Sequence, residues 1–492
     1  MTTIPLTIPF GSQDFTALFP CFIVACGALL VLLLDLLFPA SLRRGWSILI
    51  ALATLGIAGV SALNGWGEPI SVFANAFVTG SLTVAFEEIV VIGAALSMLL
   101  MYTAGRDDQA AGAIALLLWS ASGAMLMAGA SNLMVVFLGL ELLSLGLYCL
   151  CGFVTRRVAR EAALKYLLLS STASAVMLYG MALLFGATGS VDFNALALPS
   201  ASPVMFDLGV GLFLVGLAFK LSLVPFHEWT PDVYAGAPLP VTAFMSVVTK
   251  AGALAVLIRF VGALPPNISD QLVQPLWVVA GLSMIVGNVG ALAQTDLKRL
   301  LAYSGIAQLG YIVAALAVRN DNGLYSAIFY LAAYTFMNLG AFAVAALLSR
   351  DEEEGTHLAS FRGLSGRKPL LAGAMTFFLL GLAGIPPTAG FTGKVLILAN
   401  TIGAGFVNLA VLLVIGTAIS FYAYLKIVRL MYAPSFGQGV NVVVPRSRLP
   451  WIAIAVCAVA VLVLALHPIV PTGSFATLKS EVKDRVSVQS AY

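Results

Sequence analysis

The chain has 492 residues and a formal net charge of +3, and 60% of its residues are hydrophobic while only 10% are charged. A soluble domain carries about a quarter charged residues, and the mean hydropathy of this chain is +1.01. Apolar stretches of about 18 residues or more recur along the whole length, which excludes a large soluble domain and predicts an all-α polytopic membrane protein.

These apolar stretches predict fourteen membrane-spanning helices when each is matched to a span of about 20 residues. In chain order the spans cover residues 18–38, 46–63, 82–102, 112–129, 132–154, 165–185, 205–227, 240–264, 272–293, 299–318, 324–348, 370–402, 407–432 and 450–470. No basic residue precedes the first span, so we expect a retained helix rather than a cleaved signal.

Lys and Arg are distributed unequally over the loops that join these spans. The loops after odd-numbered spans hold sixteen of them: Arg43, Arg44, Arg106, Arg156, Arg157, Arg160, Lys165, Lys298, Arg299, Arg350, Arg362, Arg367, Lys368, Arg429, Arg446 and Arg448. The opposite side holds five: Arg259, Arg319, Lys479, Lys483 and Arg485. Because cytoplasmic loops retain basic residues, we expect both termini on the extracytoplasmic side.

Four basic residues remain, and each lies inside a predicted span: Lys220, Lys250, Lys394 and Lys426. A charged side chain at the centre of a bilayer helix costs about 2.5–3.5 kcal/mol on insertion scales, so it usually faces a polar interior and has a function. Lys426 lies close to Arg429 near the end of its span and could extend to the surface. The other three lysines have no such exit, and Glu141 also lies near the middle of a span.

Prolines interrupt two of the spans that contain these lysines. Pro225 follows Lys220 in the span 205–227, whereas Pro386 and Pro387 precede Lys394 in the span 370–402. Proline frees backbone carbonyls at membrane depth, and these persist only where protein or water satisfies them. An ordinary kink packed against neighbouring helices is the alternative for either break, but two broken spans at corresponding places of two halves indicate an inverted repeat.

The broken spans divide the chain into four expected segments. Residues 1–111 hold the first three spans, and residues 433–492 hold the last span and a tail. Residues 112–264 form a first repeat of spans four to eight, and residues 265–432 form a second repeat of spans nine to thirteen. Each repeat has five spans with the broken one fourth, so the two repeats are expected to have opposite orientations in the membrane.

One acid and three lysines inside the membrane suit proton transfer. Desolvation and neighbouring cations favour neutral lysine, which can then take up and release a proton, and Glu141 could serve as a counter-charge. The five cysteines lie in apolar runs without partners at zinc-ligand spacing. We therefore expect no metal and no cofactor in this chain.

Several further polar residues are candidates for supporting roles. Tyr303 and Gln308 in the tenth span and Tyr334 in the eleventh could order water chains, although each taken singly is more often a helix-packing contact. His227 follows the break in the seventh span. It could line a cytoplasmic inlet or simply cap a short helix.

The segments that carry these residues resemble a known family. They read "LGLELLSLGLYCL", "FKLSLVPFHEWTPDVYAGAP", "VTKAGA", "LKRLLAYSGIAQLGY" and "GLAGIPPTAGFTGK". Essentially the whole chain is similar to the antiporter-like membrane subunits of respiratory NADH:quinone oxidoreductase, complex I. Lysine at position 394 and the absence of a long lateral helix after the last span make it most similar to the N type of these subunits.

This resemblance implies a proton-translocating subunit in which Glu141, Lys220, Lys250 and Lys394 transfer protons. It implies FMN, iron–sulfur clusters, NADH and a quinone elsewhere in the complex, with other membrane-arm subunits as partners, in a bacterial inner membrane. The family often has histidine where this chain has Gln308, which removes a titratable group from that position. The alternative is a subunit of a multi-subunit cation/proton antiporter, which shares the fold and these motifs.

Overall fold

The computed structural model describes residues 11–37, 39, 42–103, 109–154, 156–198, 202–348, 356–434 and 448–466. Both chain termini, whose placement outside the cytoplasm we expect, lie outside the described residues. So do six of the basic residues used for that expectation: Arg106, Arg350, Arg446, Lys479, Lys483 and Arg485.

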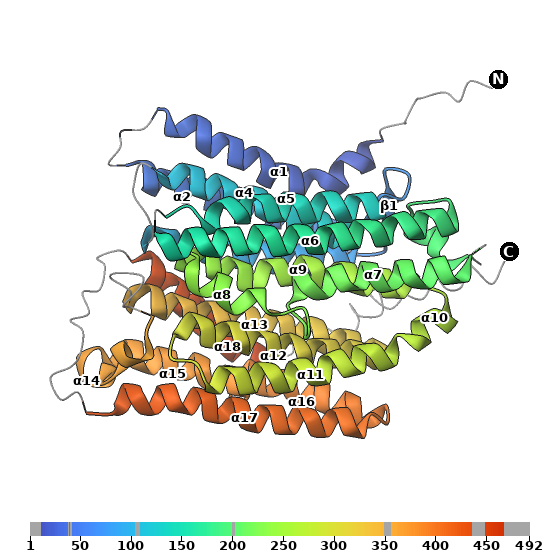
Figure 1. Ribbon diagram of the computed structural model, residues 1–492. Coiled ribbons are helices and arrows are strands. Elements are labelled where there is room, and N and C mark those ends of the chain that lie inside the picture. Colours follow the sequence, from blue (N-terminus) through green and yellow to red (C-terminus); the bar gives the residue numbers. More distant parts are fainter. Residues whose placement is uncertain are drawn as a thin grey trace.

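The described residues form a bundle of long, roughly parallel helices (Figure 1). Thirteen spans in this part of the chain are long and apolar enough to cross a membrane. They are α1 (Ser12–Asp35), α2 (Arg43–Leu63), α3 (Ser81–Leu100), α4 (Ala110–Gly129), α5 (Leu133–Cys151), α6 (Arg157–Thr188), α7 (Pro203–Leu221), α9 (Leu239–Ala263), α10 with α11 (Pro266–Gln271 and Val273–Leu292), α12 (Leu297–Ala317), α13 (Asp321–Leu348), α17 (Val407–Tyr432) and α18 (Leu449–Leu466). The predicted polytopic α-helical fold is confirmed.

The remaining predicted span, 370–402, is divided into two helices of 15 residues each, α15 (Pro369–Ala383) and α16 (Ala389–Gly403). The short helix α8 (Trp229–Gly236) likewise follows α7 after a gap, and a single turn, α14 (Leu364–Arg367), precedes α15. Both interrupted spans are therefore present where the sequence predicts them.

A small β-hairpin joins α2 to α3, and the sequence did not predict it. Strand β1 (Ile70–Val72) pairs antiparallel with β2 (Phe77–Thr79). Asp14 at the start of α1 accepts a hydrogen bond from the backbone N–H of Phe73 in the hairpin turn (2.9 Å). Strands of three residues are too short for an alternating apolar pattern to become visible in the sequence.

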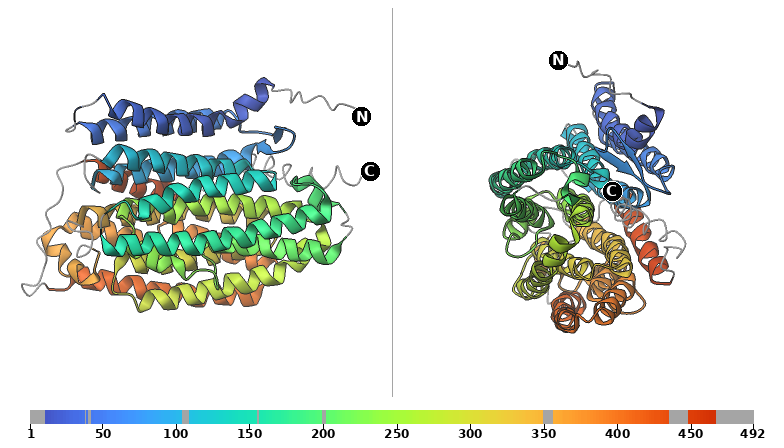
Figure 2. Two further views of the ribbon diagram at one scale, coloured as in Figure 1. Left: turned by 45° about the horizontal axis from the view of Figure 1, so that its top comes forward. Right: turned by 90° about the vertical axis from the view of Figure 1, so that its right-hand side faces the viewer.

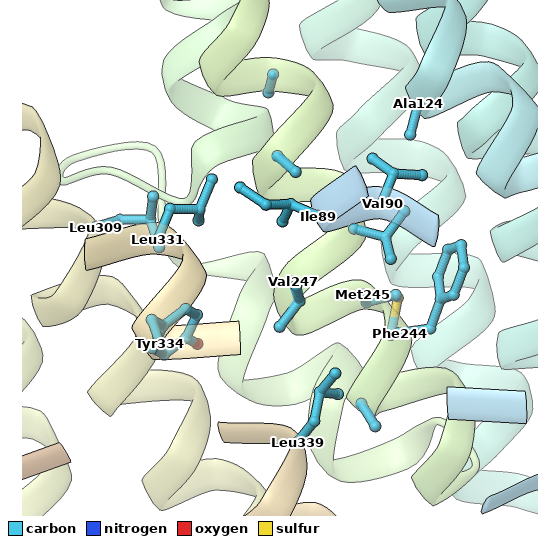
Figure 3. Packing of buried hydrophobic residues seen from close by; sticks show 14 of the residues in the cluster. Ile89, Val90, Ala124, Phe244, Met245, Val247, Leu309, Leu331, Tyr334 and Leu339 are labelled. Carbon is cyan, nitrogen blue, oxygen red and sulfur yellow. The ribbon is translucent and has the colours of Figure 1, made fainter. Parts of the chain in front are cut away.

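Helices α9, α12 and α13 form the centre of the bundle, and most of their residues are buried. Figure 3 shows α9 packed between α3 and α13, with Val90 of α3, Val247 of α9 and Leu339 of α13 in one apolar cluster. The blue helices α1 and α2 lie at one edge of the bundle and α17 lies at the opposite edge (Figures 1 and 2). A helix that is buried on all sides can expose its polar groups only to other protein groups, so polar side chains on α9, α12 and α13 have to be satisfied inside the bundle.

The first break begins where α7 ends at Leu221. Ser222 takes the left-handed conformation with φ of 60°. The N–H of Leu223 then reaches back to the carbonyl of Ala218 (2.9 Å), which is the Schellman arrangement of a helix C-terminus. Pro225 follows three residues after Ser222, and its preceding peptide bond is cis.

The second break repeats this geometry at the same spacing. Helix α15 ends at Ala383, Gly384 has φ of 84°, and the N–H of Ile385 donates to the carbonyl of Leu380 (3.0 Å). Pro387 again follows three residues after the left-handed residue, and its preceding peptide bond is cis. The shared order of helix end, left-handed residue and proline supports the two predicted repeats, whose limits at 112–264 and 265–432 remain predictions.

Candidate functional site

Lys220 is the next-to-last residue of α7, and its side chain is only 1% exposed. Its Nζ donates hydrogen bonds to Ser144 Oγ on α5 (2.7 Å) and to Tyr166 OH on α6 (3.0 Å). The same Nζ lies 5.4 Å from the centroid of the Tyr166 ring. Two hydroxyl groups and an aromatic ring thus take the place of water around this amine.

Glu141 and Lys220 do not form an ion pair, although they interact electrostatically. The Glu141 carboxylate accepts a hydrogen bond from Ser174 Oγ on α6 (2.7 Å), and Tyr148 OH donates to Ser170 Oγ (2.7 Å). These contacts belong to two facing stripes, which we call the α5/α6 polar ladder: Glu141, Ser144 and Tyr148 on α5, and Tyr166, Ser170 and Ser174 on α6. Residues three or four positions apart share one face of a helix, so the ladder places hydroxyl groups between Glu141 and the groups that hold Lys220.

Lys250 on α9 binds the end of the broken helix α7. Its Nζ donates to the backbone carbonyl of Lys220 (2.9 Å) and to Ser222 Oγ (2.5 Å). It also lies 5.0 Å from the centroid of the Trp229 ring, which stacks on the ring of Tyr166 at 4.8 Å. Lys220 and Lys250 therefore share one cluster at the first break.

Lys394 does the same at the second break. Its Nζ donates to the carbonyls of Leu382 (3.0 Å) and Ala383 (3.1 Å), the last two residues of α15, and lies 4.8 Å from the centroid of the Tyr311 ring. Leu382 is the next-to-last residue of α15, as Lys220 is of α7. A helix C-terminus carries a partial negative charge. The carbonyl end of each broken helix therefore attracts a lysine amine without the help of an acidic side chain.

Gln308 on α12 joins the Lys394 cluster. Its Nε2 donates to the Leu382 carbonyl (3.1 Å) and to Tyr424 OH (3.4 Å), and its Oε1 accepts a hydrogen bond from Tyr330 OH. Tyr424 OH is also hydrogen bonded to Ser304 Oγ (2.5 Å). The predicted amide therefore lies directly beside the lysine, with two tyrosines that the sequence analysis did not select.

Tyr334 on α13 lies between the two clusters. It is buried, and it is close enough to Tyr234 of α8 and to Tyr424 of α17 to interact electrostatically with both. Tyr303, in contrast, packs its ring against Gly290 of α11 and makes no hydrogen bond with the cluster residues within the described part of the chain. The structure brings Tyr334 to the site and leaves Tyr303 at its margin.

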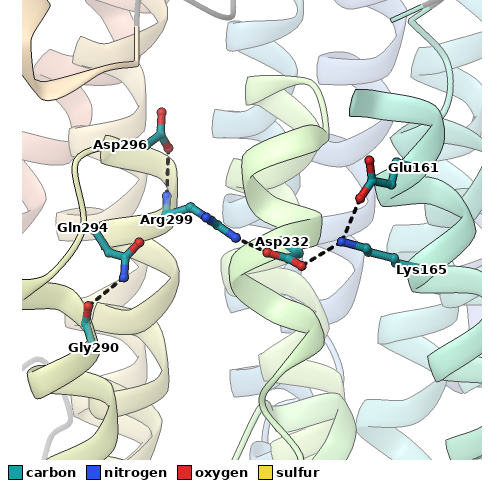
Figure 4. Close-up of polar contacts among 7 residues, drawn as sticks. All are labelled: Glu161, Lys165, Asp232, Gly290, Gln294, Asp296 and Arg299. Carbon is teal, nitrogen blue, oxygen red and sulfur yellow. Dashed lines mark hydrogen bonds and ion pairs between the residues drawn. The ribbon is translucent and has the colours of Figure 1, made fainter. Parts of the chain in front are cut away.

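A row of ion pairs crosses the end of the bundle near His227. Asp232 on α8 accepts from Lys165 on α6 (2.9 Å) and from Arg299 on α12, and Lys165 also pairs with Glu161 (2.9 Å; Figure 4). His227 lies half-buried between α7 and α8. These groups are partly exposed, so the pairs contribute little stability individually, but they tie α8 to both α6 and α12.

Replacing Gly384 by alanine is expected to displace Lys394, because an added Cβ would lie 2.8 Å from Lys394 Cδ. Gly405→Ala is the matched control, since Gly405 has the same φ of 84° but open space around its Cβ position. In each variant, alanine has to adopt the left-handed conformation, which lowers the free energy of unfolding by about 1–2 kcal/mol. We expect only Gly384→Ala to lower proton pumping in membranes with equal amounts of protein; equal activity of the two variants would contradict this placement of Lys394.

Comparison with known proteins places the chain in a family. The profile of the family described as NADH:quinone oxidoreductase/Mrp antiporter, transmembrane, matches residues 130–420. The NADH-quinone oxidoreductase subunit N 1 of Symbiobacterium thermophilum is 40% identical over 92% of this chain and 96% of its own length. The chain belongs to the NADH:quinone oxidoreductase/Mrp antiporter family.

Solved structures of this family have the same fold. A chain of respiratory complex I from Thermus thermophilus, determined with bound aureothin, is 35% identical, with a TM-score of 0.78 and coverage of 91% of this chain and 97% of that one. A chain of the Mrp complex from Dietzia has a TM-score of 0.84 and covers 96% of this chain and 98% of its own length, but it is 20% identical. At that identity the likeness shows the fold alone.

The sequence analysis missed most hydrogen-bonding partners of the family's membrane lysines. A signal for one group was present: Tyr166, Ser170 and Ser174 recur every four residues in an otherwise apolar helix, as expected for one polar face. Trp229, Tyr330 and Tyr424 gave no such signal, because an isolated aromatic residue in a membrane span is most often a packing residue. Their roles become visible only when helices distant in the sequence are placed side by side.

Proposed function

We propose that this chain is the N-type, proton-translocating membrane subunit of an NADH:quinone oxidoreductase. The observation that carries the proposal is the repeated cluster in which a buried lysine amine binds the carbonyl end of a broken helix, Lys250 at α7 and Lys394 at α15. A charge at membrane depth is costly and is retained mainly along ion or proton pathways. The names of the 35–40% identical relatives favour this assembly over a cation/proton antiporter.

In the first half, Glu141 and Lys220 exchange a proton through hydroxyl groups. Ser144, Ser174 and the two tyrosines of the α5/α6 polar ladder can each donate and accept a hydrogen bond, so the ladder can relay a proton between the carboxylate and the amine. Glu141 acts on Lys220 electrostatically but is not ion-paired with it. Without a closed ion pair, the proton on Lys220 is not locked in place and can leave again.

The proton then passes from Lys220 to Lys250. Lys250 binds the backbone carbonyl of Lys220, so two ammonium groups would lie in one water-poor cluster if both were protonated. Like charges in such a place disfavour each other's charged state. One lysine therefore tends to hold the proton at a time, which gives the transfer a direction when Glu141 changes its charge.

In the second half, the path continues to Lys394. Three tyrosines from different helices form a series in space between the first cluster and Gln308: Tyr234, Tyr334 and Tyr424. Gln308 and Lys394 both donate to the Leu382 carbonyl. The amide can order hydrogen bonds but cannot itself carry charge. Lys394 is then the last titrating residue of the proposed path.

The proposal also includes the orientation of the subunit in the membrane and its partner subunits. Both termini lie on the extracytoplasmic side of a bacterial inner membrane, and the Asp232 ion pairs with nearby His227 lie at the cytoplasmic inlet. FMN, iron–sulfur clusters, NADH and the quinone belong to other subunits of the complex. Co-purification separates the alternatives, since an N-type subunit travels with a flavin and iron–sulfur arm and an antiporter subunit does not.

Glu141→Gln is expected to lower proton pumping about tenfold, the effect of a barrier higher by about 1.4 kcal/mol, because glutamine keeps the hydrogen bond from Ser174 but cannot change charge. Pumping and NADH oxidation are measured in vesicles with equal amounts of assembled complex. Ser174→Ala removes only the hydrogen bond at Glu141 and is expected to have the smaller effect. Normal pumping in assembled Glu141→Gln complex would refute the role of this acid.

A further inference from the structure

Among the described residues, the proposed path leaves one fully buried acid unused. Glu87 lies on α3, inside a membrane span, and is only 2% exposed. Helix α3 packs against α9, and Figure 3 shows Ile89 and Val90 of α3 beside that helix. Keeping an acid there is costly unless it is paired or has a function, so its surroundings decide what it can do.

The hydrogen bonding around Glu87 is sparse. Among the described residues, its carboxyl group has one hydrogen-bond partner, the thiol of Cys21 on α1, with Sγ 3.7 Å from Oε1. Thiols are weak donors, so this contact stabilises a carboxylate only slightly. The group is thus not locked into one charge state by strong donors.

Arg259 on α9 supplies the nearest positive charge. It interacts electrostatically with Glu87, and its guanidinium donates hydrogen bonds to Thr83 Oγ1 (from Nη2, 2.6 Å) and to the Ala128 carbonyl (from Nε, 3.0 Å). Thr83 lies one turn before Glu87 on the same face of α3. These two contacts hold the guanidinium in place, so Arg259 acts on the carboxyl as a fixed charge.

Glu88 adds a second carboxyl at the same depth. Its Oε1 is buried and has no hydrogen-bond partner in the described part of the protein, and a Cβ at Gly59 of α2 would lie 3.5 Å from its oxygens. Glu87 interacts electrostatically with Glu88 as well as with Arg259, so ionisation of both carboxyl groups would leave one negative charge unbalanced. Uptake of one proton by the pair removes that charge.

The position of Arg259 on α9 places the two carboxyl groups relative to Lys250. Lys250 and Arg259 are nine residues apart on α9, about 14 Å along the helix axis. The carboxyl groups therefore lie between the level of Lys250 and the surface at which α9 ends, which is the extracytoplasmic surface in the proposed orientation. None of the other helices that pack on α3 contributes a charged group that interacts with Glu87 among the described residues.

We propose that Glu87, with Glu88 beside it and Arg259 as a fixed counter-charge, is a second proton-binding site of this subunit. It rests on the proposed function, because it binds a proton on the outlet side of Lys250. The site takes up a proton when Lys250 loses its charge and releases the proton toward the surface at which α9 ends. It lies on the side of α9 toward α1–α3 and is distinct from the path to Lys394.

The test uses complex assembled with Glu87→Gln, Glu87→Asp or Lys250→Ala, with Glu68→Gln as a control acid in the exposed loop before β1. Pumping and NADH oxidation are compared at equal amounts of complex. We expect Glu87→Gln to lower pumping about tenfold, Glu87→Asp to retain most of it, and Glu68→Gln to have no effect. Wild-type pumping in Glu87→Gln would overturn the site.

An infrared difference spectrum during turnover provides a second readout that a purely structural role would not give. We expect a carbonyl band of a protonated carboxylic acid that shifts in D2O and moves in Glu87→Asp; no change in that band on this substitution would overturn the site, even if Glu87→Gln fails to assemble. Lys250→Ala separates the two proposals. Normal pumping there would contradict the lysine path, whereas loss of pumping there with normal Glu87→Gln would contradict only the second site.

Discussion

Replacing Lys394 by alanine is expected to lower proton pumping by about 100-fold or more, the usual contribution of a group that transfers a proton. The substitution removes the last titrating residue of the proposed path and leaves the carbonyls of Leu382 and Ala383 without the amine that binds them. If electron transfer is tightly coupled to pumping, quinone reduction falls as well. The measurements are pumping and NADH oxidation at equal amounts of assembled complex.

Lys394→Arg separates charge from titration. A guanidinium can still donate to the carbonyl end of α15 and complement its partial negative charge, but it stays protonated at any accessible pH. We therefore expect the arginine variant to assemble better than alanine and to pump no better. Full pumping by Lys394→Arg would show that a fixed positive charge is enough and would reject a titrating lysine.

Lys426→Ala is the control for this pair of variants. Lys426 also lies within a helix that spans the membrane, but it is exposed, and its Nζ donates to the carbonyls of Leu292, the last residue of α11, and of Gln294 (3.2 and 3.3 Å). This agrees with the sequence-based interpretation that Lys426 reaches the surface. Pumping close to that of the unmodified protein is expected, because only a surface contact is lost.

The breaks could be predicted from the sequence because their cause is local. Proline and the left-handed residue act on the chain within a few positions, and lysine in an apolar run is visible in any sequence. The structure refines the positions, since α7 ends at Leu221 and α15 at Ala383, several residues before the prolines. The residue before a proline is disfavoured in a helix, and the left-handed residue already ends each helix before that point.

The contacts of the lysines could not be predicted in the same way, because they join residues far apart in the chain. The sequence analysis selected Gln308, but its partners Tyr330 and Tyr424 come from two other helices. It proposed Glu141 as a counter-charge, and Glu141 does interact electrostatically with Lys220. It did not identify the hydroxyl groups at the two ends, Ser144 at the amine and Ser174 at the carboxylate. Periodicity indicates which face of a helix is polar, but it does not indicate which neighbour that face meets.

Replacing Lys220 by methionine is also expected to lower pumping by about 100-fold or more. Methionine keeps an unbranched side chain of nearly the same length and leaves the backbone carbonyl to which Lys250 donates, so the end of α7 retains its contact with α9. The variant therefore removes the proton carrier and leaves the break intact. It also removes the hydrogen bonds that Lys220 makes to Ser144 and Tyr166.

Tyr166→Phe and Ser144→Ala test the two hydroxyl groups that hold the Lys220 amine, one at a time. Each removes one hydroxyl that accepts a hydrogen bond from the Lys220 amine, and hydrogen bonds to charged groups contribute about 1.5–3 kcal/mol. We expect each to lower pumping about tenfold and the double variant to approach Lys220→Met, because the amine then loses both partners. Phenylalanine also keeps the stacking on Trp229, so a change in assembly is not expected. If Lys220→Met pumps normally while Lys394→Ala does not, the first half of the chain carries no proton and the path through Glu141 is rejected.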